Sequence, residues 1–104
     1  MTDDPNGQQE PASAARISGE VTIPNLKGLH ARASAQFVKC AERFGANVQV
    51  THDGQTVLGK SIMGLMMLAA GQGNTILIEV EGPQAREALD ALISLVSAGF
   101  NEEA

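Results

Sequence analysis

The chain contains no tryptophan, no tyrosine and only 3 phenylalanines among its 104 residues. Proteins that read single-stranded nucleic acids stack the bases on aromatic side chains, so this scarcity argues against that class of function. Basic residues are few as well, with 7 Lys and Arg against 12 Asp and Glu. The composition therefore gives no sign of a basic surface that would bind a phosphate backbone.

Cys40 is the single cysteine, which excludes an internal disulfide and fits a reducing compartment. We expect it to be a small buried apolar residue on a helix. No apolar run approaches the roughly 18 residues of a membrane-spanning helix, and the N-terminus lacks the regions of a signal peptide. A cytoplasmic location is therefore expected.

Charge and composition divide the chain into three parts. Residues 1–15 hold Pro, Gly, Asp, Gln and Ser with almost nothing to bury, so we expect a disordered N-terminal tail. Residues 16–98 carry the apolar periodicity of one compact domain, and residues 99–104 are expected to form a C-terminal tail. All of the net charge of -5 falls in the two tails, and residues 16–98 are balanced.

Apolar periodicity predicts four strands and three helices in the order β-α-β-β-α-β-α. The predicted elements are a strand from near Arg16 to Pro24, a helix with apolar positions from Ala33 to Phe44, strands at Val48–Thr51 and Gln55–Leu58, a short helix from Ile62 to about Ala70, a strand at TILIEVEG, and a helix from Pro83 to Val96.

This order on so short a chain predicts an α+β fold: a four-stranded, mostly antiparallel sheet with three helices on one face. The two longer helices carry apolar stripes that would pack on the sheet. The short helix SIMGLMMLAAG is apolar nearly all round, so it is either wholly buried or partly exposed as an apolar patch.

The stretch GQTVLGKS, residues 54–61, matches the phosphate-loop pattern G-x-x-x-x-G-K-[ST]. A phosphate loop is a wide backbone nest between a parallel strand and a helix, whereas Thr56–Leu58 favours an extended strand. Asp53-Gly54 is a strong signal for a hairpin turn, and the chain is too short for a doubly covered parallel sheet. A hairpin is therefore favoured, and nucleotide binding is a remote alternative.

The stretch GLHAR, residues 28–32, places His30 where the loop after the first strand becomes a helix. Free N–H groups and the helix dipole disfavour imidazolium there, so the ring is expected to be neutral and nucleophilic near pH 7. A phosphoryl group on His30 would meet the amides of Ala31 and Arg32 and the Arg32 guanidinium. The residues alone support a second interpretation equally well: His30 is a polar residue between loop and helix, and Arg32 is a solvated charge in the first turn.

The run GLHARASAQFVKCAERFGANVQV, followed by GKSIMGLMMLAAGQG, resembles HPr, the histidine phosphocarrier of the phosphoenolpyruvate-dependent phosphotransferase system. The resemblance covers about Ile17 to Ser97. It implies an open-faced β-sandwich and a phosphoryl-relay protein rather than an independent multi-turnover enzyme. It also implies a phosphoryl group accepted from enzyme I and passed to a histidine of an EIIA-type protein, without a metal or other cofactor.

The same resemblance implies roles for individual residues. His30 matches the histidine that enzyme I phosphorylates on Nδ1, and Arg32 matches the arginine that steadies the phosphoryl group, beside the Ala31 amide. Ser61 matches the serine that HPr kinase/phosphorylase phosphorylates in many members, and its position also suits a helix cap. Ala33 departs from the proline common after the arginine, which leaves open whether a sugar-transport or a nitrogen-type acceptor is served.

Docking on successive partners gives the apolar short helix a role. We expect a monomer that binds neither nucleic acid nor membrane, with Leu65 and Leu68 in the core. The alternative is a regulatory module of the same fold that binds partners without histidine phosphorylation. The expected partner-binding residues are Ile62, Met63, Met66, Gln36 and Lys39.

Overall fold

The sheet in this computed structural model, which describes residues 16–102, has four strands that all pair antiparallel. The strand order is β2-β5-β3-β4, so β5 and β3 are central. The expected N-terminal tail, residues 1–15, lies outside the described residues. The strands are β2 (Arg16–Thr22), β3 (Asn47–His52), β4 (Gln55–Leu58) and β5 (Thr75–Glu81).

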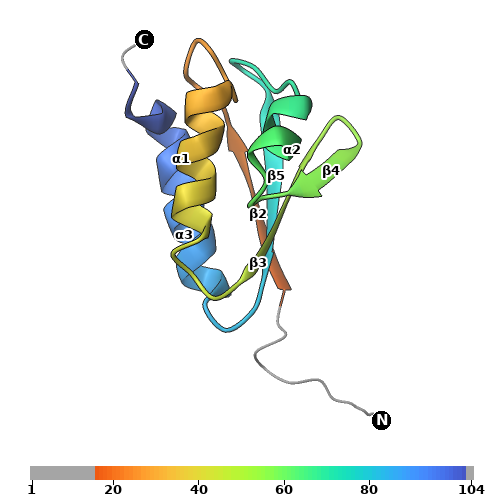
Figure 1. Cartoon of the computed structure of the whole chain (residues 1–104), viewed down its shortest axis with the longest axis vertical. Coiled ribbons are helices and arrows are strands. Elements are labelled where there is room, and N and C mark those ends of the chain that lie inside the picture. The colour runs from red at the N-terminus through yellow and green to blue at the C-terminus, as the bar shows by residue number, and fades with distance from the viewer. Residues whose placement is uncertain (1–15, 103–104) are drawn as a thin grey trace.

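Helices cover one face of the sheet and leave the other face open (Figure 1). The described helices are α1 (Ala31–Ala41), α2 (Ile62–Met67) and α3 (Ala85–Ser97), followed by a single 3-10 turn η2 (Gly99–Asn101). The long helices α1 and α3 lie side by side, and α2 packs beside α1 near β4. The architecture confirms the predicted open-faced α+β sandwich.

Strand β5 shows why the sheet has one buried face. Ile76, Ile78 and Val80 are fully buried, whereas the residues between them are only partly buried. This alternation places every second side chain against the helices. The core lies between the sheet and the two long helices, where Phe37 of α1 and Leu92 of α3 are also fully buried.

The stretch that matches the phosphate-loop pattern lies partly in the hairpin between β3 and β4. Asp53 and Gly54 have φ angles of 52° and 79°, the left-handed pair that a tight two-residue hairpin turn requires. His52 pairs with Gln55 across that turn. The first half of GQTVLGKS is thus a turn and a strand, and the backbone there does not form a phosphate nest.

Three predicted boundaries are wrong by a few residues. Helix α2 ends at Met67 instead of near Ala70, because Ala69 adopts a left-handed φ of 53°. Helix α1 ends at Ala41, and beyond it the amides of Arg43 and Phe44 bond to carbonyls three residues back, which tightens the last turn. Helix α3 begins at Ala85, after Pro83.

Residues 99–102, which were expected in a C-terminal tail, pack against the domain. Phe100 is 1% exposed and joins the core. The turn is left-handed, with positive φ at Gly99, Phe100 and Asn101. A lone aromatic residue after a glycine carries no periodic signal, so this anchor lies outside what apolar periodicity detects.

Gly28 fixes the loop that leads into α1. Its φ is +61°, and a Cβ atom built there would lie 2.5 Å from the Ala70 carbonyl oxygen. The next residue, Leu29, donates its N–H to that same oxygen at 3.0 Å. The close approach of the two backbones therefore requires glycine.

We predict that Gly28→Ala lowers the free energy of unfolding by about 3 kcal/mol, from a left-handed alanine plus a backbone clash. Gly54→Ala is the matched control, because its φ is also positive but nothing lies within 4 Å of the added Cβ. That variant should lose about 1 kcal/mol. Urea denaturation measures both, and equal losses would contradict the role given to the Ala70 contact.

Candidate functional site

His30 is the N-cap residue of α1, with an extended backbone at φ -74° and ψ -179°. Its carbonyl accepts the first helical hydrogen bond, from the Ser34 amide at 2.9 Å. The buried Ser34 hydroxyl donates to the Leu29 carbonyl at 3.1 Å. The backbone around His30 is thus held firmly, while its side chain makes no cap hydrogen bond and turns toward a surface pocket.

That pocket, which we call the histidine pocket, is a shallow hollow of about 360 Å³. It brings together three of the predicted residues, His30, Arg32 and Gln36. Lys39 does not line it and instead borders a neighbouring groove between α1 and α3. The complete lining is Lys27, His30, Arg32, Gln36, Phe100, Asn101 and Glu102.

Positive charge and free amides gather at the pocket. Lys27 and Arg32 are both exposed there. The amides of Ala31, Arg32 and Ala33 belong to the first turn of α1 and have no partner within the helix. Ala33 keeps an N–H that a proline would lack. An anion next to the His30 ring would therefore meet cations and backbone donors together.

A carboxylate contacts the ring at Nε2. His30 Nε2 lies 2.5 Å from Oε2 of Glu102, whose side chain is 16% exposed. The buried Asn25 amide donates from Nδ2 to Oε1 of Glu102 at 3.0 Å and to the Gly28 carbonyl at 3.1 Å. The hydrogen bond from His30 is the main cause that lowers the pKa of Glu102, with smaller contributions from Asn25 and nearby positive charge, while desolvation opposes the shift.

Three residues of the site were not predicted from the sequence: Lys27, Asn25 and Glu102. Asn25 and Lys27 lie in the loop NLKGLH, where a polar residue carries no signal of burial. Glu102 is separated from His30 by 72 residues, and only the left-handed turn around Phe100 brings it back. A contact of that kind depends on tertiary packing alone.

Ser61 caps α2 as predicted, since its Oγ accepts a hydrogen bond from the Gly64 amide at 3.0 Å. Leu65 and Leu68 are buried, as expected. The apolar patch of α2 is larger than the predicted set, because Met67 is also exposed. The exposed fractions are 40% for Ile62, 68% for Met63, 39% for Met66 and 64% for Met67.

Cys40 is buried in α1 as predicted, and burial raises the pKa of its thiol against the opposing charge of Arg43. Among residues 16–102, no group of three or more His, Cys, Asp and Glu side chains lies in an arrangement that could hold a metal ion. None of the helices in this range is long and apolar enough to cross a membrane.

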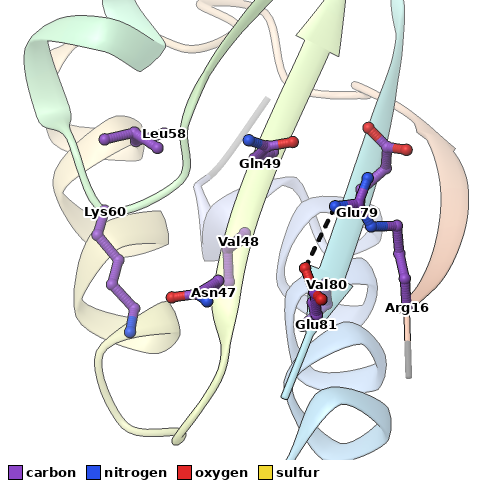
Figure 2. A pocket seen from close by; sticks show the side chains of 9 residues that line it. All are labelled: Arg16, Asn47, Val48, Gln49, Leu58, Lys60, Glu79, Val80 and Glu81. Carbon is purple, nitrogen blue, oxygen red and sulfur yellow. Dashed lines mark hydrogen bonds and ion pairs between the residues drawn. The ribbon is translucent and has the colours of Figure 1, made fainter. Parts of the chain in front are cut away.

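A second hollow, of about 310 Å³, lies on the open face of the sheet (Figure 2). Glu81 and Arg16 form an ion pair there at 3.2 Å. Lys60, the lysine of the phosphate-loop pattern, lies at its edge, and its ammonium donates to the Ala46 carbonyl at 2.9 Å. His30 does not line this hollow, so it is separate from the histidine pocket.

Comparison with known proteins agrees with this geometry. The family model described as "PTS HPr component phosphorylation site" matches residues 17–98. The chain belongs to the HPr family of phosphocarriers of the phosphotransferase system. It is 48% identical over 86 residues to phosphocarrier protein HPr of Cupriavidus necator, an alignment that covers 83% of this chain and 97% of the relative.

Solved HPr structures share the fold. The crystal structure of HPr-C-His from Thermoanaerobacter tengcongensis has a TM-score of 0.81 and 40% identity, and the match covers 85% of this chain and 99% of that chain. An HPr dimer from the same organism has a TM-score of 0.67 and 41% identity, over 79% and 94% of the two chains. Because that relative is described as a dimer, the monomeric state of this chain stays a prediction.

The lowered pKa of Glu102 predicts a pH-dependent stability. The carboxylate stabilises the folded state above its ordinary pKa of about 4.5, and this contribution is lost as the pH falls through the lower folded value. The free energy of unfolding of the wild type should therefore exceed that of Glu102→Gln at about pH 6, and the difference should shrink below about pH 4. Urea unfolding across this range measures it.

Glu102→Ala should show the same pH trend, because both variants remove the carboxylate. A stability difference that stays constant from neutral to acid pH would mean that the ionised carboxylate contributes nothing to the fold.

Proposed function

We propose that this HPr-family chain is a cytoplasmic phosphocarrier that accepts a phosphoryl group on Nδ1 of His30. Enzyme I is the donor, and a histidine of an EIIA-type protein is the acceptor. The observation that carries the proposal is the histidine pocket, where an imidazole meets Arg32, Lys27 and the first-turn amides of α1. No metal or nucleotide takes part in this proposal.

Transfer between two histidines needs positioning and charge stabilisation more than further covalent chemistry. The Nδ1 lone pair attacks phosphorus as the bond to the donor nitrogen breaks. Negative charge on the equatorial oxygens is met by the Arg32 guanidinium and by the amides of Ala31 and Arg32. Gln36 lines the same pocket, and in this proposal it contacts the docked partner.

We predict that enzyme I with labelled phosphoenolpyruvate transfers acid-labile label to the wild type and none to His30→Ala. Arg32→Ala should accept the label about 10- to 100-fold more slowly, since it lacks one preorganised charge. Gel electrophoresis before and after acid treatment measures both results.

His52→Ala is the matched control, because it removes the other histidine of the chain and should leave labelling intact. Wild-type protein that takes no label, or only acid-stable label, would overturn the carrier function. That outcome would favour a regulatory module of the same fold that acts by binding alone.

The apolar patch of α2 supports a docking surface for these partners. Ile62, Met63 and Met66 are 40%, 68% and 39% exposed, and α2 packs against α1, the helix whose N-cap residue is His30. Methionine side chains are flexible, which suits a surface that docks on more than one partner. Lys39 on the exposed side of α1 is a rim contact in this proposal.

Ser61 is the proposed regulatory phosphosite, with HPr kinase/phosphorylase as its kinase. Its hydroxyl is partly buried as the cap of α2. A phosphoryl group there would add nearly two negative charges, which the helix N-terminus tolerates. The new charge would lie next to Ile62 at the start of the apolar patch and would repel an acidic docking surface on enzyme I.

We predict that Ser61→Asp lowers the rate of phosphorylation by enzyme I about 10-fold at low salt, whereas Ser61→Asn leaves it near the wild-type rate. Both side chains are good helix caps, so the pair differs in charge and not in helix stability. The kinetic assay is repeated at high salt, where screening should shrink the difference. Equal rates for the two variants would contradict a charge-based regulation.

A further inference from the structure

The direction of the hydrogen bond between His30 and Glu102 follows from the chemistry of the carboxylate. An ionised carboxylate only accepts hydrogen bonds, so Nε2 must donate the proton in the 2.5 Å contact to Oε2. In a neutral imidazole the other ring nitrogen then carries the lone pair. The contact therefore selects the tautomer in which Nδ1 is the nucleophile.

Asn25 fixes the orientation of the carboxylate. Its Nδ2 donates both protons to oxygens, at 3.0 Å to Oε1 of Glu102 and at 3.1 Å to the Gly28 carbonyl. Asn25 is 4% exposed, and its Oδ1 is buried without a hydrogen-bond partner among the described residues. The reversed amide would set Oδ1 against two oxygens, so the donors must face Glu102 even at the cost of a buried unpaired acceptor.

A left-handed turn in the backbone before Glu102 places this residue next to His30. Phe100 is buried with a φ of 57°, and Asn101 follows with a φ of 60°, both uncommon for residues other than glycine. The Glu102 amide donates to the Gly99 carbonyl at 3.0 Å, which closes the turn. An unfavourable backbone held by a buried anchor points to a constrained function for the residue it presents.

We propose that Glu102, oriented by Asn25, is a positioning residue that keeps the proton on Nε2 of His30 and so directs phosphoryl transfer to Nδ1. This inference rests on the proposed carrier function. Glu102 does not contact the phosphoryl group in this scheme, and it acts through the imidazole.

The proton stays on Nε2 through the whole relay. When the donor P–N bond breaks and the P–Nδ1 bond forms, the Nδ1 lone pair is used and the ring becomes positively charged. The carboxylate of Glu102 faces that charge at Nε2. In the onward step the P–Nδ1 bond breaks, its electron pair returns to Nδ1, and the acceptor nitrogen forms the new bond.

Glu102→Gln tests the inference because it is expected to reverse the tautomer. The Gln oxygen would keep the hydrogen bond from Asn25 Nδ2, so its NH₂ group would face His30 and would need Nε2 as an acceptor. The proton would then move to Nδ1. Nitrogen-15 NMR of the ring should show this change, and phosphorylation by enzyme I should slow about 10-fold, the scale of one hydrogen bond to a charged group.

Two further variants separate positioning from plain structural support. Glu102→Ala removes both hydrogen bonds but presents no donor to Nε2, so it should be less impaired than Glu102→Gln. The double variant Asn25→Ala with Glu102→Gln frees the amide to rotate and should restore part of the lost rate and tautomer. Glu87→Gln, an exposed carboxylate in the first turn of α3, is the matched control and should behave as wild type.

The outcomes keep the two proposals distinct. If wild-type protein takes no label from enzyme I, the carrier function fails whatever the NMR shows. If wild-type protein is labelled but Glu102→Gln keeps the Nε2–H tautomer and the wild-type rate, the positioning role is overturned. If Glu102→Ala is at least as slow as Glu102→Gln, Glu102 only anchors the end of the chain, which also overturns it.

Discussion

The hydrogen bond from the Leu29 amide to the Ala70 carbonyl joins the two halves of the candidate site. It ties the loop before α1 to the segment after α2, and Gly28 permits it because no Cβ atom fits against Ala70. His30 follows directly on the loop side. This hydrogen bond therefore fixes the position of the histidine relative to the apolar patch of α2. A partner that docks on α2 would find the imidazole in a defined place.

Features with a local physical cause were predictable from the sequence. The hairpin follows from Asp53-Gly54, since both residues tolerate a left-handed backbone. The alternation in β5 and the apolar spacing in α1 identify their buried faces. Ser61 was recognisable as a cap because a serine preceded a helical pattern. Each of these features is determined by residues that lie within a few positions of it in the sequence.

The parts that escaped prediction depend on contacts between distant residues. Asn25 and Glu102 are 77 positions apart, and their hydrogen bond exists only because Phe100 enters the core. The end of α2 was misplaced because Ala69, a good helix former, adopts a left-handed backbone beside the Leu29 contact. In both cases tertiary packing outweighed the local preference, which a periodic pattern does not record.

The candidate site brings opposite charges to a single imidazole ring. Arg32, Lys27 and the first turn of α1 favour an anion in the histidine pocket, while Glu102, which lines the same pocket, places a carboxylate at Nε2. A phosphoryl group near Nδ1 and a carboxylate near Nε2 would repel each other if they met directly. When the phosphoryl group is bonded to Nδ1, the ring between the two groups is positively charged and compensates for both. Glu102 therefore disfavours a free anion in the pocket but stabilises the positively charged ring of the phosphorylated histidine.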